Sequence, residues 1–221
     1  MTKKLLQLYG LKWNPFAPDV PTDALLATGR IDSFAWRVEQ LAREGGFAAV
    51  IGDPGTGKSV TLRLLAARLA GLRDVVVGVL TRPQAGVADC YRELGHLFGV
   101  ALSPHNRWAD AKALRDLWLA NIDAALFRPV LLVDEAQDVR TEVLNELRLL
   151  ASADLDARVI LTVVLAGDRR LQDRLRDVEL LPLDSRLRVK LLLEGAARDD
   201  LAQCLRHALE QAGNPRLLTP G

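Results

Sequence analysis

Residues 52–59 carry the most recognisable chemistry in this chain, because their glycines, lysine and hydroxyl have the spacing of a loop that wraps a phosphate group. Glycine lets the backbone approach an anion closely and direct successive N–H groups at it. Lys58 supplies a positive charge for the β- and γ-phosphates, and Ser59 offers its hydroxyl to Mg²⁺. The segment and the adjoining Val60 therefore predict an ATP site, with Ser59 as a ligand of Mg²⁺. Its residues are Gly52, Asp53, Pro54, Gly55, Thr56, Gly57, Lys58, Ser59 and Val60.

A pair of acids, Asp134 and Glu135, follows the apolar run 130–133. The run predicts a buried strand, and α/β sheets bind ligands at the carboxyl ends of such strands. Asp134 is expected to hold Mg²⁺ directly or through water. Glu135 lies one residue further, so it points differently and is suited to orient or deprotonate an attacking water. Together with Lys58 the pair predicts hydrolysis of ATP, and the alternative is a solvated acidic loop.

Five apolar runs predict the strands that would position these residues. They are 47–51, 75–80, 130–133, 159–165 and 187–193, and helical patterns lie between them. Strands that alternate with helices form a parallel sheet covered on both faces. The pattern therefore predicts a three-layer α/β sandwich.

The composition limits the partners that this chain can bind. Its 29 basic and 28 acidic residues leave a net charge of +1, which excludes a polybasic coat, so binding to nucleic acid requires a local patch. Cys90 and Cys204 are too few for a disulfide framework and fit a reducing compartment. No apolar run reaches the roughly 18 residues that a membrane span needs. We therefore expect a cytoplasmic protein with no membrane partner.

Several motifs are more specific than the phosphate loop. They are Tyr9-Gly10-Leu11, Asn14-Pro15-Phe16, Gly46-Phe47, Asp134-Glu135-Ala136-Gln137 and Leu165-Ala166-Gly167-Asp168. With the phosphate loop they resemble AAA+ ATPases over about residues 5–213, and more narrowly the ExeA-like group. That group includes secretion ATPases and the TniB, TnsC and MuB type helpers of DNA transposition. The resemblance implies a P-loop NTPase fold whose five-stranded parallel sheet has the order 5-1-4-3-2.

The resemblance also implies catalytic roles for two residues outside the phosphate loop. Asp168, at the end of the fourth strand, corresponds to the sensor 1 residue that contacts the γ-phosphate or the lytic water; the alternative is a turn aspartate before a helix. Arg186, before the fifth strand, corresponds to the arginine finger that reaches the γ-phosphate of a neighbouring subunit, and Arg188 is the alternative. An arginine that acts in trans implies a homo-oligomer, either a ring or a helical filament.

The chain is expected to contain three parts. Residues 1–30 are predicted to form an extended, proline-punctuated arm that packs on the nucleotide site, residues 31–195 an AAA+ ATPase core, and residues 196–221 a partial lid with one helix. The resemblance places Asn14 and Phe16 over the adenine, although Phe16 fits a core anchor for the arm better. The lid is shorter than AAA+ proteins usually carry, so we interpret it as truncated or naturally reduced.

Two functions remain open for such an ATPase. The first is a helper that binds duplex DNA with ATP and recruits or activates a transposase; the second is an ExeA-like secretion or signalling ATPase that acts on a protein partner. The cationic stretch 104–112 with its tryptophan favours the first, because basic side chains bind DNA phosphates. The candidate DNA contacts are Arg82, His105, Asn106, Arg107 and Lys112, and the alternative is a solvated loop before a capped helix.

Overall fold

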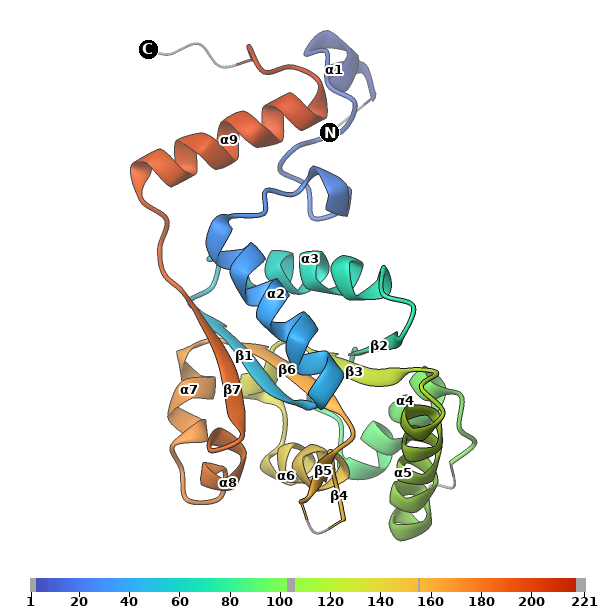
Figure 1. Ribbon diagram of the computed structural model, residues 1–221. Coiled ribbons are helices and arrows are strands. Elements are labelled where there is room, and N and C mark those ends of the chain that lie inside the picture. The colour runs from blue at the N-terminus through green and yellow to red at the C-terminus, as the bar shows by residue number, and fades with distance from the viewer. Residues whose placement is uncertain (1–2, 103–105, 155, 218–221) are drawn as a thin grey trace. The chain divides into compact units, whose positions relative to one another are not determined.

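The computed structural model describes residues 3–102, 106–154 and 156–217 of the chain. They form two compact units (Figure 1). The larger unit is residues 29–193, and the smaller unit joins residues 1–28 to residues 194–221. The phosphate loop and the acid pair both belong to the larger unit.

A parallel sheet of five strands forms the centre of the larger unit. Its strands, in spatial order, are β2 (Val75–Leu80), β3 (Arg128–Val133), β6 (Thr162–Gly167), β1 (Gly46–Gly52) and β7 (Leu187–Leu193). Counted along the chain as five strands, this is the order 5-1-4-3-2, which confirms the prediction. Because all the strands run in the same direction, the carboxyl ends of β1, β3 and β6 lie on one edge of the sheet. Arg186, which precedes the amino end of β7, lies on the opposite edge.

Helices cover both faces of this sheet (Figure 1). Successive side chains of a strand point to opposite faces, so Val130 and Leu132 pack with one helical layer, and Leu131 and Val133 pack with the other. The first layer contains α2 (Gly29–Glu44) and α3 (Lys58–Ala70). The second contains α4 (Val87–Phe98), α5 (Arg107–Asp123), α6 (Thr141–Leu150), α7 (Arg169–Leu175) and α8 (Leu181–Asp184). The predicted three-layer sandwich is confirmed.

One predicted strand is divided in two. Within the apolar run 159–165, the short strand β5 (Arg158–Val159) pairs antiparallel with β4 (Ser152–Ala153), and β6 begins only at Thr162. Asp154 and Asp156 allow this hairpin to turn tightly, since both adopt a left-handed backbone that aspartate tolerates better than most residues. Apolarity alone does not reveal where a buried run changes its pairing partner.

The smaller unit contains α1 (Lys3–Leu8), the short 3-10 helix η1 (Thr22–Ala24) and α9 (Arg198–Ala212). Its two chain segments are joined by hydrogen bonds from Lys12 N to Ala212 O (2.8 Å) and from Asn214 Nδ2 to Tyr9 O (2.6 Å). We expected residues 1–30 to be extended, but residues 3–8 form the helix α1. These residues precede Pro15, the first proline of the arm, so no proline prevents a helix there. The single predicted lid helix corresponds to α9, which ends at Gly213 with φ 106°.

Candidate nucleotide-binding site

Three motifs meet at the carboxyl edge of the sheet. Gly52 ends β1, Asp134 follows β3, and Asp168 follows β6. The strand β6 pairs with both β1 and β3, so it lies between the strand that carries the phosphate loop and the strand that carries the acids. The parallel sheet therefore gathers residues that are more than a hundred positions apart in the sequence.

The phosphate loop has the backbone that its glycines permit. Gly55 and Gly57 have φ angles of 82° and 98°, a region that residues with a side chain rarely adopt. The loop closes on itself, because Thr56 donates from both its backbone N and its Oγ1 to Asp53 O, at 3.2 and 2.8 Å. An added Cβ at Gly55 or Gly57 would meet no other atom within 4 Å, so both glycines face open space.

The lysine of the loop is already directed into it. Lys58 is only 7% exposed, and its Nζ donates to Gly52 O (3.0 Å) and Asp53 O (3.3 Å). An ammonium group has three N–H donors, so a phosphate oxygen can accept from it as well. A buried cation of this kind suits a ligand that is itself strongly negative.

Two oxygen ligands suitable for Mg²⁺ lie side by side. Ser59 Oγ donates to Asp134 Oδ2 (2.9 Å), and Asp134 Oδ1 accepts from Glu135 N (2.9 Å). Mg²⁺ prefers carboxylate, hydroxyl, water and phosphate oxygens. Because the pair stands next to the N-terminus of α3, which begins at Lys58, the residues present fit a magnesium-bound triphosphate.

Glu135 is connected to the end of β6 through Gln137. Gln137 lies on the 3-10 helix η2 (Ala136–Asp138) and is 7% exposed. Its Nε2 donates to Glu135 Oε2, and its Oε1 accepts from Asp168 N (3.2 Å). Sequence reasoning assigned no role to Gln137, although a polar residue two positions after the candidate base is a signal that was present.

Asp168 caps the helix that follows it. Its Oδ1 accepts from Arg170 N (2.9 Å), and its Oδ2 lies 2.8 Å from Arg170 Nη2. The hydrogen bonds from Arg170, with a contribution from the charge of Lys58, hold the pKa of Asp168 below its ordinary value. The side chain therefore remains ionised at the edge of the phosphate site. The structure shows the capping role, and a contact with γ-phosphate or water stays a prediction.

A further ion pair crosses the site. Arg169, at the start of α7, places Nη2 at 2.8 Å from Oδ2 of Asp53 in the phosphate loop. The sequence motifs did not point to this contact, because the two residues are more than a hundred positions apart. Both side chains are well exposed, so the pair adds little to stability on its own.

Arg186 lies at the opposite edge of the sheet from the phosphate loop, because it immediately precedes β7. Its guanidinium donates to Ser152 Oγ (2.6 Å) and to Asp156 Oδ2 (2.7 Å) on the β4–β5 hairpin. Arg188 pairs with Glu44 (3.1 Å). The structure therefore does not bring either arginine to the phosphate site of its own chain.

The candidate adenine contacts are not buried. Phe16 exposes 67% of its surface, so the alternative that it anchors the arm in a core is not supported. Asn14 Oδ1 accepts from Phe16 N (3.2 Å), which stabilises a local turn. Contact of these two residues with a nucleotide stays a prediction.

One candidate DNA contact, Arg107, has a buried partner within the chain. Arg107 forms an ion pair with Glu146, a buried carboxylate that also accepts from Tyr91 Oη (2.5 Å). Burial and the hydrogen bond to Glu146 raise the pKa of Tyr91, so the phenol stays a donor. This cluster joins α4, α5 and α6, and it gives Arg107 a structural role that the sequence did not reveal.

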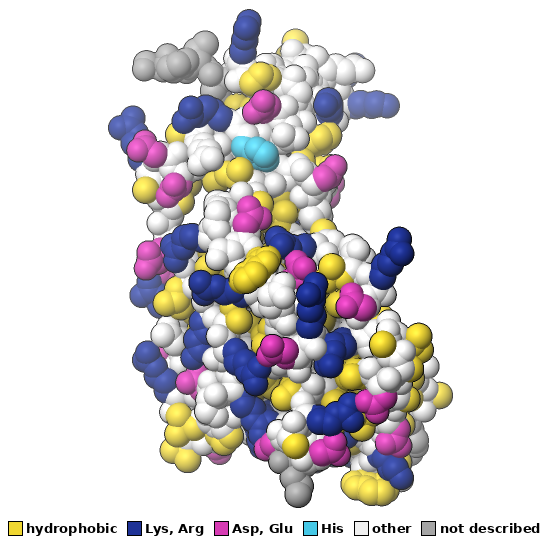
Figure 2. Space-filling model, viewed as in Figure 1, with side chains coloured by type: hydrophobic (Ala, Val, Ile, Leu, Met, Phe, Trp, Pro, Cys, Tyr) yellow, Lys and Arg dark blue, Asp and Glu magenta, His cyan; other side chains and the backbone are white. Residues whose placement is uncertain are grey.

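The remaining candidates differ in how firmly they are held. Asn106 caps α5 by accepting from Ala109 N (3.1 Å), as the alternative interpretation expected. Lys112 lies 5.8 Å from the centre of the Trp108 ring, which is 74% exposed. Arg82 lies in the loop after β2, and His105 lies outside the described residues. Figure 2 shows basic side chains mixed with acidic ones rather than one continuous basic field on the visible face.

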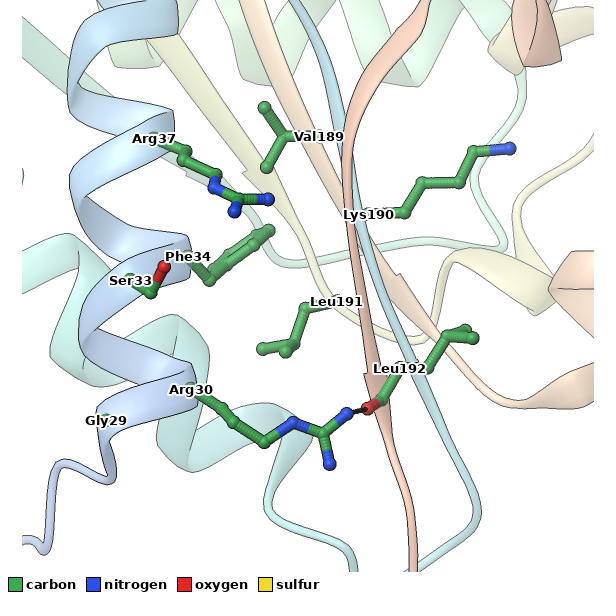
Figure 3. A pocket seen from close by; sticks show the side chains of 9 residues that line it. All are labelled: Gly29, Arg30, Ser33, Phe34, Arg37, Val189, Lys190, Leu191 and Leu192. Atoms are coloured by element: carbon green, nitrogen blue, oxygen red, sulfur yellow. Dashed lines mark hydrogen bonds between the residues drawn. The ribbon is translucent and has the colours of Figure 1, made fainter.

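A cavity of about 440 Å³ lies between α2 and β7 (Figure 3). Phe34 and Leu191 provide its apolar floor, and Arg37 points into it beside Val189. Arg30 donates to Leu192 O (2.6 Å) at its other end. None of the phosphate-loop residues line this cavity.

The fold and this site define a class of protein. The chain belongs to the family described as AAA domain, whose model matches residues 41–175. This confirms the resemblance to AAA+ ATPases and the P-loop nucleotide-binding fold; the narrower transposition-helper branch stays a prediction. Among the described residues, no helix has both the length and the apolarity needed to cross a bilayer.

Individual proteins are also similar to the chain. General secretion pathway protein A of Aeromonas hydrophila is 32% identical over 212 residues, which are 94% of this chain and 38% of that protein. Among solved structures, Cdc6p from Pyrobaculum aerophilum has a TM-score of 0.64 and 18% identity, covering 89% of this chain and 52% of that one. The ORC1 protein of Aeropyrum pernix in complex with DNA has a TM-score of 0.63 and 19% identity, covering 93% and 55%. At these identities the solved structures show a shared fold.

Proposed function

We propose that the protein binds Mg²⁺ and ATP at the phosphate loop and hydrolyses the ATP. The observation that carries this proposal is the convergence of Lys58, the Ser59–Asp134 pair and Glu135 on one edge of the sheet. A site that only bound nucleotide would need the first three of these residues. The carboxylate of Glu135 next to them supplies a proton acceptor, which hydrolysis requires.

The chain's own residues have distinct tasks in this reaction. The backbone N–H groups of Gly55 and of residues 57–59, with the ammonium of Lys58, bind the phosphates, and Ser59 with Asp134 would hold Mg²⁺. When bound, the metal neutralises charge on the β- and γ-phosphate oxygens. Glu135 accepts a proton from a water whose oxygen attacks the γ-phosphorus. The bond from that phosphorus to the bridging oxygen breaks, and ADP and phosphate are released.

Titration calorimetry tests the binding step directly. We expect saturable heat, with about one site per chain, when ATP is added to the folded protein in the presence of Mg²⁺, since the loop and its lysine already have a binding conformation. The same titration in EDTA should show weaker binding. Folded protein that gives no heat with adenine nucleotides would contradict the proposal at its first step.

We further propose that Arg186 completes the phosphate site of a neighbouring copy, so that the active form is a homo-oligomer. Its position on the edge opposite the phosphate loop supports this role, because the side chain lies away from the phosphate site of its own chain. A planar, permanently charged guanidinium suits the charge that develops on a transferred phosphoryl group. Release of Arg186 from Asp156 and Ser152 would accompany the contact.

Duplex DNA is the partner that we favour, with recruitment of a transposase by the ATP-bound oligomer. Arg82 and the Lys112–Trp108 pair supply exposed charge for phosphate contacts. A second candidate is action on a protein partner, as in a secretion or signalling ATPase. The specific observation in its favour is the 32% identity to General secretion pathway protein A.

Salt-dependent DNA binding separates these two functions. The double substitution Arg82→Ala with Lys112→Ala is expected to weaken ATP-dependent binding to duplex DNA and to reduce the slope of log K against log salt by about 2, because each lost phosphate contact releases about one counterion fewer. Fluorescence anisotropy over a series of salt concentrations measures both quantities. Arg107→Ala is unsuitable, since it would leave the buried Glu146 without its cation.

The matched control is Arg43→Ala with Arg176→Ala, which removes two exposed arginines whose ion pairs are long, at 3.8 and 3.9 Å. It should leave DNA binding within about twofold of the original. If the Arg82 and Lys112 double variant bound duplex DNA as tightly as the unaltered protein does, this surface would not be the DNA contact. Absence of ATP-dependent duplex binding in the unaltered protein would favour the protein partner.

A further inference from the structure

Gln137 occupies an unusual position for a polar side chain. It is buried, yet both ends of its amide have partners within the nucleotide site: Nε2 donates to the Glu135 carboxylate, and Oε1 accepts from the backbone N of Asp168 (3.2 Å). Buried polar groups normally find partners, but these two partners are the candidate base and the end of the neighbouring strand β6. One side chain therefore spans two separate parts of the site.

The chemistry of this bridge requires a carboxamide. A bridging side chain must donate to an ionised carboxylate at one end and accept from an N–H group at the other, and a carboxamide does both without charge. An ionised carboxylate at position 137 would still accept from Asp168 N but would not donate to Glu135. An aliphatic side chain of similar size would do neither. The residue type is thus matched to both contacts.

Surrounding groups hold Gln137 in place. An added Cβ at Gly167 would lie 2.8 Å from Gln137 Oε1, so the glycine at the end of β6 allows the amide to approach. On the other side, Arg174 donates from Nη1 to Gln137 O (2.5 Å) and from Nη2 to Thr141 Oγ1 (3.1 Å). The backbone of η2 is therefore held from α7, and the side chain of Gln137 is held from the end of β6.

Glu135 itself depends on such support. Its φ of 49° is left-handed, a conformation that non-glycine residues keep only where the surrounding structure imposes it. Its backbone N donates to Asp134 Oδ1 (2.9 Å), which fixes the start of the residue but not the direction of its carboxylate. The described contact that fixes the carboxylate is the one from Gln137.

We infer that Gln137 is a positioning residue, which aims the Glu135 carboxylate at the attacking water and ties that carboxylate to the end of β6 beside Asp168. The inference rests on the proposed ATP hydrolysis and adds to it a residue that does not touch the nucleotide. Because one amide joins the two strand ends, a shift of the β6 end would change the aim of Glu135. Misplacement of a reacting group by about 1 Å costs up to about a hundredfold in rate.

Two substitutions of Gln137 test this role through steady-state ATP hydrolysis. Gln137→Leu removes both contacts and is expected to lower kcat by about 10- to 100-fold, with KM for ATP and affinity for ADP within about threefold of the original, since the phosphate loop is unchanged. Gln137→Glu keeps the length and the contact with Asp168 N but removes the donor to Glu135. We expect it to lower kcat at least as much as Gln137→Leu does.

The glutamate variant distinguishes positioning from a merely structural bridge. If Gln137 only held the end of β6, Gln137→Glu would restore kcat relative to Gln137→Leu, and that result would overturn the inference. The control Gln40→Leu alters a half-buried glutamine of α2 and should leave kcat unchanged. Normal kcat in both Gln137 variants would overturn the positioning role while leaving the proposed hydrolysis intact. An inactive original protein that binds ATP would overturn hydrolysis first, and the positioning role with it.

Discussion

Glu135→Gln is expected to lower ATP turnover by about 10²- to 10⁴-fold while ATP still binds with an affinity within about threefold of the original. The substitution keeps the size of the side chain and removes its ability to accept a proton from water. Gln137 Nε2 can still donate to the remaining amide oxygen, so the local structure should persist. Phosphate release measures turnover, and titration calorimetry measures affinity on the same preparation.

The matched control is Glu142→Gln, which changes an exposed glutamate in the first turn of α6. It should leave both quantities unchanged, because this carboxylate lies outside the nucleotide site. Undiminished turnover in Glu135→Gln would remove Glu135 as the base. Loss of ATP binding together with turnover would mean instead that Glu135 holds the nucleotide or the fold.

The second large effect is expected from Lys58→Ala, which should weaken ATP binding by about a hundredfold or more. One charge-assisted hydrogen bond contributes about 1.5–3 kcal/mol, and Lys58 also donates to two carbonyl groups of the loop itself. The substitution therefore removes a cation from the phosphates and a constraint from the loop that surrounds them. Calorimetric titration with ATP and Mg²⁺ measures the change, and turnover at low ATP concentration should fall in parallel.

Lys190→Ala provides the control for Lys58→Ala. Lys190 carries the same charge but pairs with Asp184 on α8 (2.6 Å), and its side chain is 43% exposed. Its removal should leave ATP affinity within about twofold of the original, because the lost contact is a surface ion pair. If Lys58→Ala bound ATP as tightly as Lys190→Ala does, the phosphate loop would not be the nucleotide site.

Features that depend on contiguous residues could be predicted from the sequence. The runs 75–80 and 187–193 coincide with β2 and β7. β2 is an unbroken apolar run, as parallel strands commonly are, whereas Arg188 and Lys190 interrupt the apolar residues of β7, which lies at the edge of the sheet. The phosphate loop is a single eight-residue motif, and the structure brings it to Asp134 as expected. The strand order was available only through the resemblance, since apolarity says nothing about which strands are neighbours.

Features that depend on distant partners could not be predicted. Arg107 looked like a free cation in a polar stretch, but the buried acid that pairs with it lies 39 residues away on another helix. The same holds for the contact of Arg169 with Asp53, and for the second partner of Gln137. Sequence patterns report which face of an element is buried, and they do not report which polar groups meet across two elements.

The two edges of a parallel sheet are different surfaces, and here one carries the phosphate loop and the other carries Arg186. With the proposed trans role, each copy receives an arginine at one end and donates one at the other. If the copies stack head to tail, the association is heterologous, and the row of copies either stays open or closes into a ring. In an open row the terminal copy lacks a donor, so n copies complete n − 1 sites. Only closure of the row on itself would complete every site.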